Sequence, residues 1–164
     1  GDDPDVIMIG DDLAGQQGPL FSPNFDRKIV RPRQQRVIDT IKRHTKARIW
    51  YHTCGDCSPY IPDLIEMGVD ILNPVQISTR GLDPKALKDT YGDEIVFWGG
   101  GIDSQHVLPF ASPDQVREEV RRNVESFKPG GGYIFNNVHN IQAGVPPENV
   151  MAMYEAAWEF GFYG

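Results

Sequence analysis

Five short runs of consecutive apolar residues alternate with segments of helical periodicity, and this order constrains the fold more than any other feature. The runs cover residues 6–9, 48–52, 69–73, 95–98 and 133–136. Each run is apolar at neighbouring positions rather than at every second position, as expected for strands of a parallel sheet that are covered on both faces. The chain is therefore predicted to be an α/β protein.

The segments between the runs carry the start signals and the periodicity of amphipathic helices. Ser112, Pro113 and Gln115 provide a helix start with a capping box, and apolar residues then recur on one face up to Phe127. Further helices are predicted over 34–44, 61–68 and 83–92, and a last one begins at 146–147. In that last helix we expect the following residues to face inward: Val150, Met151, Tyr154, Ala157 and Trp158.

A β-α unit repeated five times forms either a doubly wound open sheet or part of a β/α barrel. A complete eightfold barrel takes about 250 residues, and this chain has 164. We therefore expect residues 1–164 to form a single domain that corresponds to the C-terminal five βα units of a TIM-type (β/α)8 barrel. Such a piece has two open sheet edges. We expect it to form a homo-oligomer or to associate with a missing N-terminal half, and to show little activity alone.

Charge and cysteine content exclude several classes of protein. The net charge of −7 argues against a nucleic-acid-binding surface. The apolar runs are far shorter than the roughly 20 residues of a membrane-spanning helix. Both cysteines lie close to one histidine, which argues against a disulfide scaffold and for a reducing, cytoplasmic setting.

Polar side chains follow every apolar run, at the strand ends where parallel α/β folds gather their functional groups. A carboxylate, an imidazole or a thiol follows four of the runs, and amides follow the remaining one. We therefore expect an active site at this edge of the sheet. The candidate substrate-binding residues at these positions are Asp11, Asn73, Gln76, Asp103, Asn136 and Asn137.

The segment "HTCGDC" at the end of the second run is a candidate zinc site. Side chains two residues apart on a strand point to the same face, so His52 and Cys54 can bind one ion. A catalytic zinc needs a third protein ligand, and His139 at the end of the last run or Cys57 can supply it. Two other interpretations remain open, namely a redox pair of cysteines and two inert buried cysteines beside a hydrogen-bonded histidine.

The strand-end segments, taken together, resemble the uroporphyrinogen decarboxylase superfamily. The matching segments are "GDDLAGQQGPLFSP", "YHTCGD", "DILNPVQ", "FWGGGIDSQ" and "YIFNNVHNIQAGVPPENV", in that order. The superfamily also includes zinc-dependent methyltransferases that move methyl groups between corrinoid proteins and thiols such as coenzyme M. The resemblance implies a β/α barrel and covers only the C-terminal part of a family member.

The resemblance implies different roles in the two branches. In the decarboxylases the histidine at the place of His139 contacts the tetrapyrrole, and Asp12 replaces a small polar substrate-binding residue. In the methyltransferases His-x-Cys, here His52 and Cys54, binds zinc. Their further cysteine ligand is replaced here by His139. The arginine-rich motif and the key aspartate of the decarboxylases would lie upstream of this sequence.

We therefore expect a zinc-dependent enzyme that transfers a methyl group between a corrinoid or other methylated donor and a thiol. Asp12 and His139 are the expected catalytic residues, and the corrinoid would be carried by a partner protein. Two alternatives remain. One is decarboxylation of a tetrapyrrole, in which His139 and the strand-end amides hold the substrate's carboxylates. The other is a non-catalytic module that binds a corrinoid or a tetrapyrrole.

Overall fold

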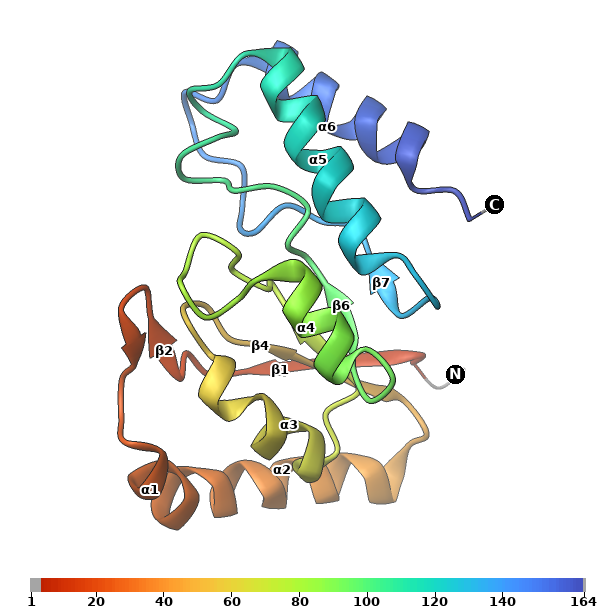
Figure 1. Cartoon of the computed structure of the whole chain (residues 1–164). Coiled ribbons are helices and arrows are strands. Elements are labelled where there is room, and N and C mark those ends of the chain that lie inside the picture. The colour runs from red at the N-terminus through yellow and green to blue at the C-terminus, as the bar shows by residue number, and fades with distance from the viewer. Residues whose placement is uncertain (1–3, 164) are drawn as a thin grey trace.

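A sheet of five parallel strands organises the chain, of which the computed structural model describes residues 4–163 (Figure 1). Each strand pairs in register with the next strand of the βα series, without reversal of the strand order. This confirms the predicted α/β class, although three strands are shorter than the apolar runs. The spatial order is β1 (Val6–Gly10), β4 (Arg48–His52), β5 (Ile71–Asn73), β6 (Val96–Trp98) and β7 (Tyr133–Ile134).

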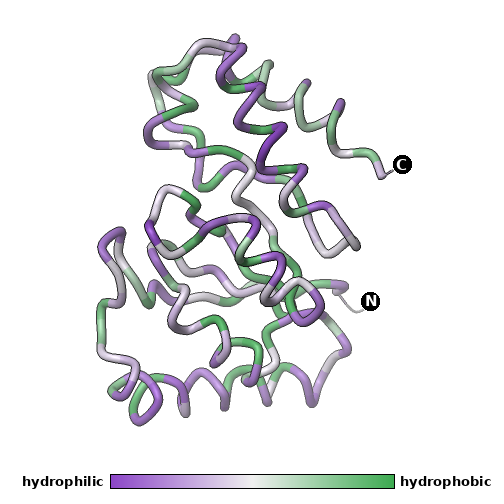
Figure 2. The backbone as a smooth tube through the Cα atoms, in the orientation of Figure 1, coloured by the Kyte–Doolittle hydropathy of each residue, from purple (hydrophilic) through white to green (hydrophobic). Residues whose placement is uncertain are grey.

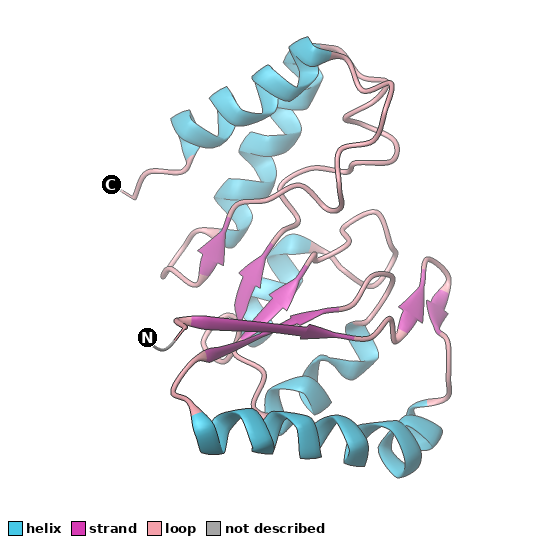
Figure 3. Cartoon of the chain, turned by 180° about the vertical axis from the view of Figure 1, so that it is seen from behind, coloured by secondary structure: helices cyan, strands magenta, loops and turns pink. Residues whose placement is uncertain are grey.

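The helices that connect these strands lie on one face of the sheet. Seen from behind, the strands are in front and this second face is open (Figure 3). A doubly wound sheet would have helices on both faces, so the arrangement is that of a partial β/α barrel. None of the helices within residues 4–163 is long and apolar enough to cross a membrane. The helices are α2 (Arg31–His44), α3 (Ile61–Met67), α4 (Pro84–Tyr91), α5 (Pro113–Phe127) and α6 (Pro147–Phe160).

Short elements between β1 and α2 are not visible in the apolar periodicity. A hairpin of β2 (Ala14–Gly15) and β3 (Gly18–Pro19) leads to α1 (Pro23–Phe25) and a π-helical turn (Asp26–Val30). The hydroxyl of Ser22 accepts the backbone N–H of Phe25 and caps the start of α1. Because the π-helical turn runs directly into α2, that helix begins at residue 31 rather than at the predicted residue 34.

The hydrophobic core lies between the sheet and its helices. Alternate residues of the central strands point toward the helices, and among them Ile49, Tyr51 and Phe97 are fully buried. The ring of Phe127 from α5 packs on Phe97 with 5.3 Å between the ring centroids. A second apolar cluster joins α5 to α6. These two clusters fix the positions of the strands, and therefore of the loops that follow them.

The opposite face of the sheet differs from the prediction that every strand is covered on both sides. Met8 is 66% exposed, and Val6 and Ile134 are also exposed on this face. Five strands form an incomplete curve, so within the described chain no second layer covers these side chains. The apolar composition of the strands therefore matches a closed barrel better than it matches this open sheet.

The inward face of α6 also differs from the prediction. Met151, Tyr154 and Trp158 are more than half exposed, whereas Met153 and Ala156 are buried against α5. Asn149, which is also buried, sets this rotation because its side-chain amide donates to the backbone carbonyls of residues 108 and 111, at 2.9 and 2.8 Å. Figure 2 shows that α6 is more apolar than α5. Several of its apolar side chains are exposed.

We predict that the 164-residue chain self-associates through its uncovered sheet face and open edges. Met8→Lys places a charge on the uncovered face at the edge strand β1 and should shift the population toward monomer without lowering the melting temperature. Val37→Lys, at an exposed apolar position on α2, is the matched control and should change nothing. Light scattering after size-exclusion chromatography measures the outcome, and a stable monomer of the unmodified chain would contradict the prediction.

Candidate metal centre

The pairing of β1 with β4 brings two polar segments together at one end of the sheet. Gly10 is paired with His52, and Asp12 and Cys54 each follow this pair by two residues. A side chain at position 10 would place its Cβ 2.4 Å from the His52 carbonyl oxygen, so the close approach requires glycine. The backbone N–H of Cys54 donates to Asp12 Oδ1 at 2.9 Å, which fixes the carboxylate next to the thiol.

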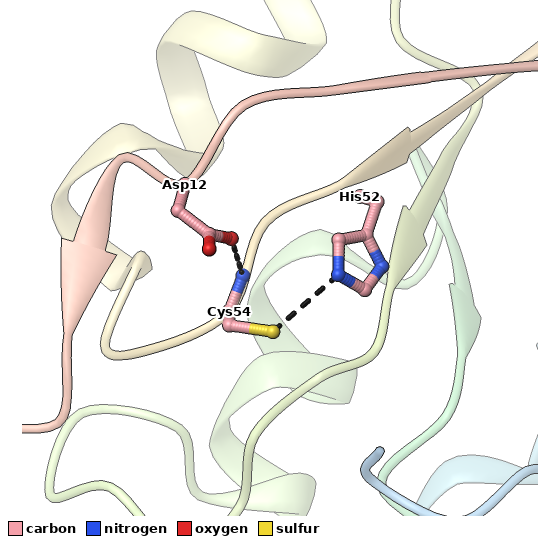
Figure 4. A group of neighbouring side chains, drawn as sticks. All are labelled: Asp12, His52 and Cys54. Carbon is pink, nitrogen blue, oxygen red and sulfur yellow. Dashed lines mark hydrogen bonds between the residues drawn. The ribbon is translucent and has the colours of Figure 1, made fainter. Parts of the chain in front are cut away.

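Asp12, His52 and Cys54 form a group with the geometry of a metal site. One ligand atom from each residue lies within 4.8 Å of the other two, and Cys54 Sγ is 3.4 Å from His52 Nε2. Figure 4 shows the carboxylate, the imidazole and the thiol side by side. Carboxylate oxygen, imidazole nitrogen and thiolate sulfur are all ordinary zinc ligands.

Asn73 holds the imidazole of His52 in the orientation that a metal ligand needs. The Asn73 amide nitrogen donates to the carbonyl oxygen of Trp98 at 2.8 Å, which identifies Oδ1 as the atom that lies 2.7 Å from His52 Nδ1. Because Oδ1 only accepts, Nδ1 carries the proton and Nε2 presents its lone pair toward Cys54. Such a partner behind the imidazole is typical of metal-bound histidines.

The two thiols have different environments. Burial, with a smaller contribution from the Asp12 carboxylate, raises the pKa of the Cys54 thiol above its ordinary value. Complete burial raises the pKa of Cys57 to about 12. Both cysteines are free. A cation bound beside Cys54 would favour its thiolate, whereas Cys57 lies in the apolar core and is suited to neither metal binding nor redox exchange.

The structure brings together two of the three predicted zinc ligands and adds a residue that was expected to be catalytic. His52 and Cys54 converge, and the third member of the group is Asp12. His139 is exposed on the loop after β7 and does not belong to this group, nor does Cys57. The ligand set offered by the described residues is therefore Asp-His-Cys, with formal charges that balance those of Zn²⁺.

Two cavities adjoin the group. One, the Cys54 cavity, has a volume of about 400 Å³ and includes Asp12 and Cys54 in its wall. The other, the His52 cavity, has a volume of about 550 Å³ and includes Trp50 and His52. His139 lines both cavities. A fourth ligand can therefore reach the group from open space, as a catalytic metal requires.

Four of the predicted substrate-binding amides line these cavities. Asn73, Asn136 and Asn137 line the His52 cavity. Gln76 lines the Cys54 cavity, where its carbonyl oxygen accepts the backbone N–H of Gly55 at 2.7 Å. Much of the hydrogen-bonding capacity of Asn73 and Gln76 is thus used to position neighbouring groups.

The other two predicted substrate-binding residues line neither cavity. Asp11 accepts a hydrogen bond from Gln34 of α2 at 3.3 Å. Asp103 accepts the backbone N–H groups of residues 105 and 106 and pairs with the ring of His106 at 2.8 Å, so it organises the loop after β6. Their carboxylates are therefore occupied by contacts within the protein.

Several cavity residues were missed by sequence reasoning. Ser104 and Gln105 line the Cys54 cavity directly after Asp103. They lie in the loop after β6, where Asp103 was predicted but its two neutral neighbours were not. Trp50 is two residues before His52 on the same strand, and this spacing was a usable signal. Gln16 lies in the unpredicted β2–β3 hairpin, for which the sequence offered no such signal.

Comparisons with known proteins agree with this architecture. The profile of the uroporphyrinogen decarboxylase family (URO-D) matches residues 2–160. A uroporphyrinogen decarboxylase from Thioalkalivibrio sulfidiphilus is 40% identical over 163 residues, which cover 95% of this chain and 42% of that protein. The enzyme of the same name from Psychromonas ingrahamii is 35% identical over 78 residues, which cover 48% of this chain and 21% of that protein.

A solved structure has the same fold. A methyltransferase from Methanosarcina mazei superposes with a TM-score of 0.74 at 24% sequence identity, covering 96% of this chain and 43% of that protein. This chain thus spans less than half the length of each of these relatives. The superposition confirms the partial barrel fold.

We predict that the neutral imidazole of His52 carries its proton on Nδ1, because Asn73 Oδ1 only accepts. Nitrogen NMR of the imidazole distinguishes the two tautomers. Asn73→Leu removes the acceptor and should abolish the preference, whereas Asn73→Asp keeps an acceptor and should retain it. An unmodified chain with the proton on Nε2 would contradict this assignment.

We predict that iodoacetamide labels Cys54 slowly at neutral pH, since its raised pKa leaves less of the reactive thiolate. The rate should continue to increase above the pH at which an exposed cysteine reaches its plateau. Cys57 is the internal control and should stay unlabelled in the folded chain. Mass spectrometry counts the labels, and both thiols should react in denaturant. Labelling of folded Cys54 as fast as a cysteine peptide at pH 7 would show that the thiol is not protected.

Proposed function

Because this chain belongs to the uroporphyrinogen decarboxylase family, we propose that it carries the zinc site of a family enzyme that transfers a methyl group to a thiol. The observation that supports this proposal best is the convergence of Asp12, His52 and Cys54 within 4.8 Å. A methyltransferase is also among the proteins that share the fold.

The residues present fit a catalytic zinc ion. Asp12, His52 and Cys54 would hold it, with Asn73 keeping His52 in the correct tautomer. Three protein ligands and an adjoining cavity leave one position for a substrate. Zinc bound there would lower the pKa of a coordinated thiol, so that a nucleophilic thiolate forms near neutral pH.

The chain's own residues would handle the substrate and its proton. The Cys54 cavity receives the thiol, and the imidazole of His139, which lines this cavity, accepts the proton that the thiol releases. A methyl donor, which we propose to be a corrinoid carried by a partner protein, would approach from the open side of the site. A reducing compartment such as the cytoplasm would keep Cys54 as a thiol.

A second candidate is decarboxylation of a tetrapyrrole. The names of the relatives favour it, as does the 40% identity over 95% of the chain. In that case the side chains of His139, Asn136 and Asn137 in the His52 cavity would donate hydrogen bonds to substrate carboxylates. This chemistry needs no metal, so zinc binding distinguishes the two candidates.

We predict that the purified chain binds about one zinc ion per molecule, as expected for a single three-residue ligand group. Loss of one ligand should lower the zinc affinity by at least about 10-fold, since the changes known for residues that only support the ligands already reach 10- to 100-fold. The variants are Asp12→Asn, His52→Ala and Cys54→Ser, with His106→Ala and Cys57→Ser as controls away from the group. Elemental analysis and competition with a chromogenic chelator measure content and affinity.

The same measurements also decide between Asp12 and His139 as the third zinc ligand. If His139→Ala lowers the affinity and Asp12→Asn does not, the Asp-His-Cys set is wrong and the set His52, Cys54 and His139 replaces it. Protein prepared without chelator that contains no metal and binds none on titration would contradict the methyltransferase proposal. Circular dichroism of each variant shows whether the fold is retained.

A further inference from the structure

Residues 73–76, here called the 73–76 segment, form the end of β5 and the first part of the loop that follows it. Because β5 lies between β4 and β6 in the sheet, this segment lies between the loop that carries Cys54 and the loop after β6. All four of its residues are buried. The segment is central in the sheet and is buried by the described chain itself, so its contacts do not depend on what lies beyond the two sheet edges.

The 73–76 segment is hydrogen-bonded to the metal-binding loop on both sides of Cys54. At its first residue, the side chain of Asn73 orients His52, and the backbone carbonyl oxygen of Asn73 accepts the N–H of the residue after His52 at 2.9 Å. At its last residue, the side-chain carbonyl oxygen of Gln76 accepts the backbone N–H of Gly55 at 2.7 Å, in a buried hydrogen bond. The backbone that carries the thiol is thus fixed before and after Cys54.

The amide of Gln76 has a defined orientation because a backbone N–H can only donate, so the oxygen and not the nitrogen faces Gly55. The amide nitrogen donates instead to the hydroxyl of Ser78 at 3.2 Å. Gly55 has a φ of +80°, and a Cβ at this position would lie 2.4 Å from the carbonyl oxygen of Ala14 in β2. Gly55 is therefore confined from two sides, and its position limits the positions open to Cys54.

The backbone of Val75, directly before Gln76, has an uncommon conformation. Its φ is +55°, in a region that β-branched residues rarely adopt, and its side chain is 1% exposed. Such a conformation persists only where the surrounding structure imposes it, and it occurs preferentially at functional sites. Here the loop after β6 contributes, because the backbone N–H of Gly100 donates to the carbonyl oxygen of Pro74 at 2.9 Å. The fold therefore maintains a strained backbone in which Gln76 contacts Gly55.

We propose that Gln76 is a positioning residue of the metal centre, which places the Cys54 thiol beside His52 by fixing the backbone of Gly55. This inference rests on the proposed function, because the position of the thiol matters for metal binding only if the group binds zinc. Gln76 supplies no ligand atom in this role. It restricts Cys54 before the ion binds, as residues that support metal ligands do. Together with Asn73, it lets one buried segment orient two of the three ligands.

Two variants of similar size test the role of the acceptor oxygen. Gln76→Met removes the acceptor for the Gly55 N–H and should lower the zinc affinity by about 10-fold, as for other residues that support metal ligands. Gln76→Glu keeps an acceptor and should retain the affinity of the unmodified chain or exceed it. Gln17→Met, at an exposed position in the β2–β3 hairpin, is the control and should change nothing. Unchanged affinity in Gln76→Met, or an equal loss in Gln76→Glu, would overturn the proposal.

Cobalt in place of zinc gives a readout that a role in stability alone would not change. At saturating cobalt, the thiolate-to-cobalt absorption band reports the bond between the ion and Cys54. This band should weaken or shift in Gln76→Met and stay unchanged in Gln76→Glu. A lower melting temperature with an unchanged band would show a merely structural role and overturn the proposal. If circular dichroism shows that Gln76→Met does not fold, Gln76→Asn, which is one carbon shorter and does not reach Gly55, replaces it.

Measurements on the metal-free chain separate failure of this inference from failure of the proposed function. The Gly55 amide should be protected from hydrogen exchange in the unmodified chain and in Gln76→Glu, and should lose its protection in Gln76→Met. Iodoacetamide should label Cys54 faster in Gln76→Met. If this pattern is found but no metal binds, the metal site is wrong and the inference falls with it. If zinc binds and the Gly55 amide exchanges freely in the unmodified chain, the proposed function stands and only the role of Gln76 is overturned.

Discussion

The register between β1 and β4 is the constraint on which the candidate site depends. Gly10 opposite His52 places Asp12 beside Cys54, and the hydrogen bond from the Cys54 backbone to the Asp12 carboxylate completes the contact. A shift of this pairing by one residue would turn alternate side chains to the other face of the sheet. It would separate the carboxylate from the thiol and move the imidazole toward the helices. The buried residues on the helix side, Ile49 and Tyr51 among them, therefore hold the chemistry in place as well as the core.

Much of the fold was predictable because a parallel sheet leaves a strong record in the sequence. Its strands are short, consecutive and apolar, and its helices begin with recognisable caps such as Ser112. The rule that polar groups gather at strand ends also led to His52 and Cys54. The β2–β3 hairpin was not predicted because strands of two residues show no periodicity in the sequence. The rotation of α6 was not predicted because it depends on the hydrogen bonds of Asn149, a buried polar residue that the pattern of apolar residues does not reveal.

The third member of the candidate metal group was not predictable from the positions of the strand ends alone. Asp12, Cys57 and His139 all follow or flank strand ends, and the sequence alone does not say which loop bends toward His52. The deciding contact is a backbone one, from Cys54 to Asp12 across adjacent strands. The exchange of imidazole for carboxylate also changes the electrostatics. Two histidines and a cysteine would leave a bound Zn²⁺ with a net positive charge, whereas Asp12, His52 and Cys54 would leave none.

Because β1 is an edge strand, the contact between Asp12 and Cys54 also affects how firmly this strand is held. One long side of this strand has no neighbour in the described chain, so only its pairing with β4 and the packing of its helix-facing side hold it in place. An ion bound by Asp12, His52 and Cys54 would stabilise the pairing of β1 with β4, because it binds the paired strands far better than a state in which β1 has detached. Occupancy of the metal group and order of the edge strand β1 would then rise and fall together.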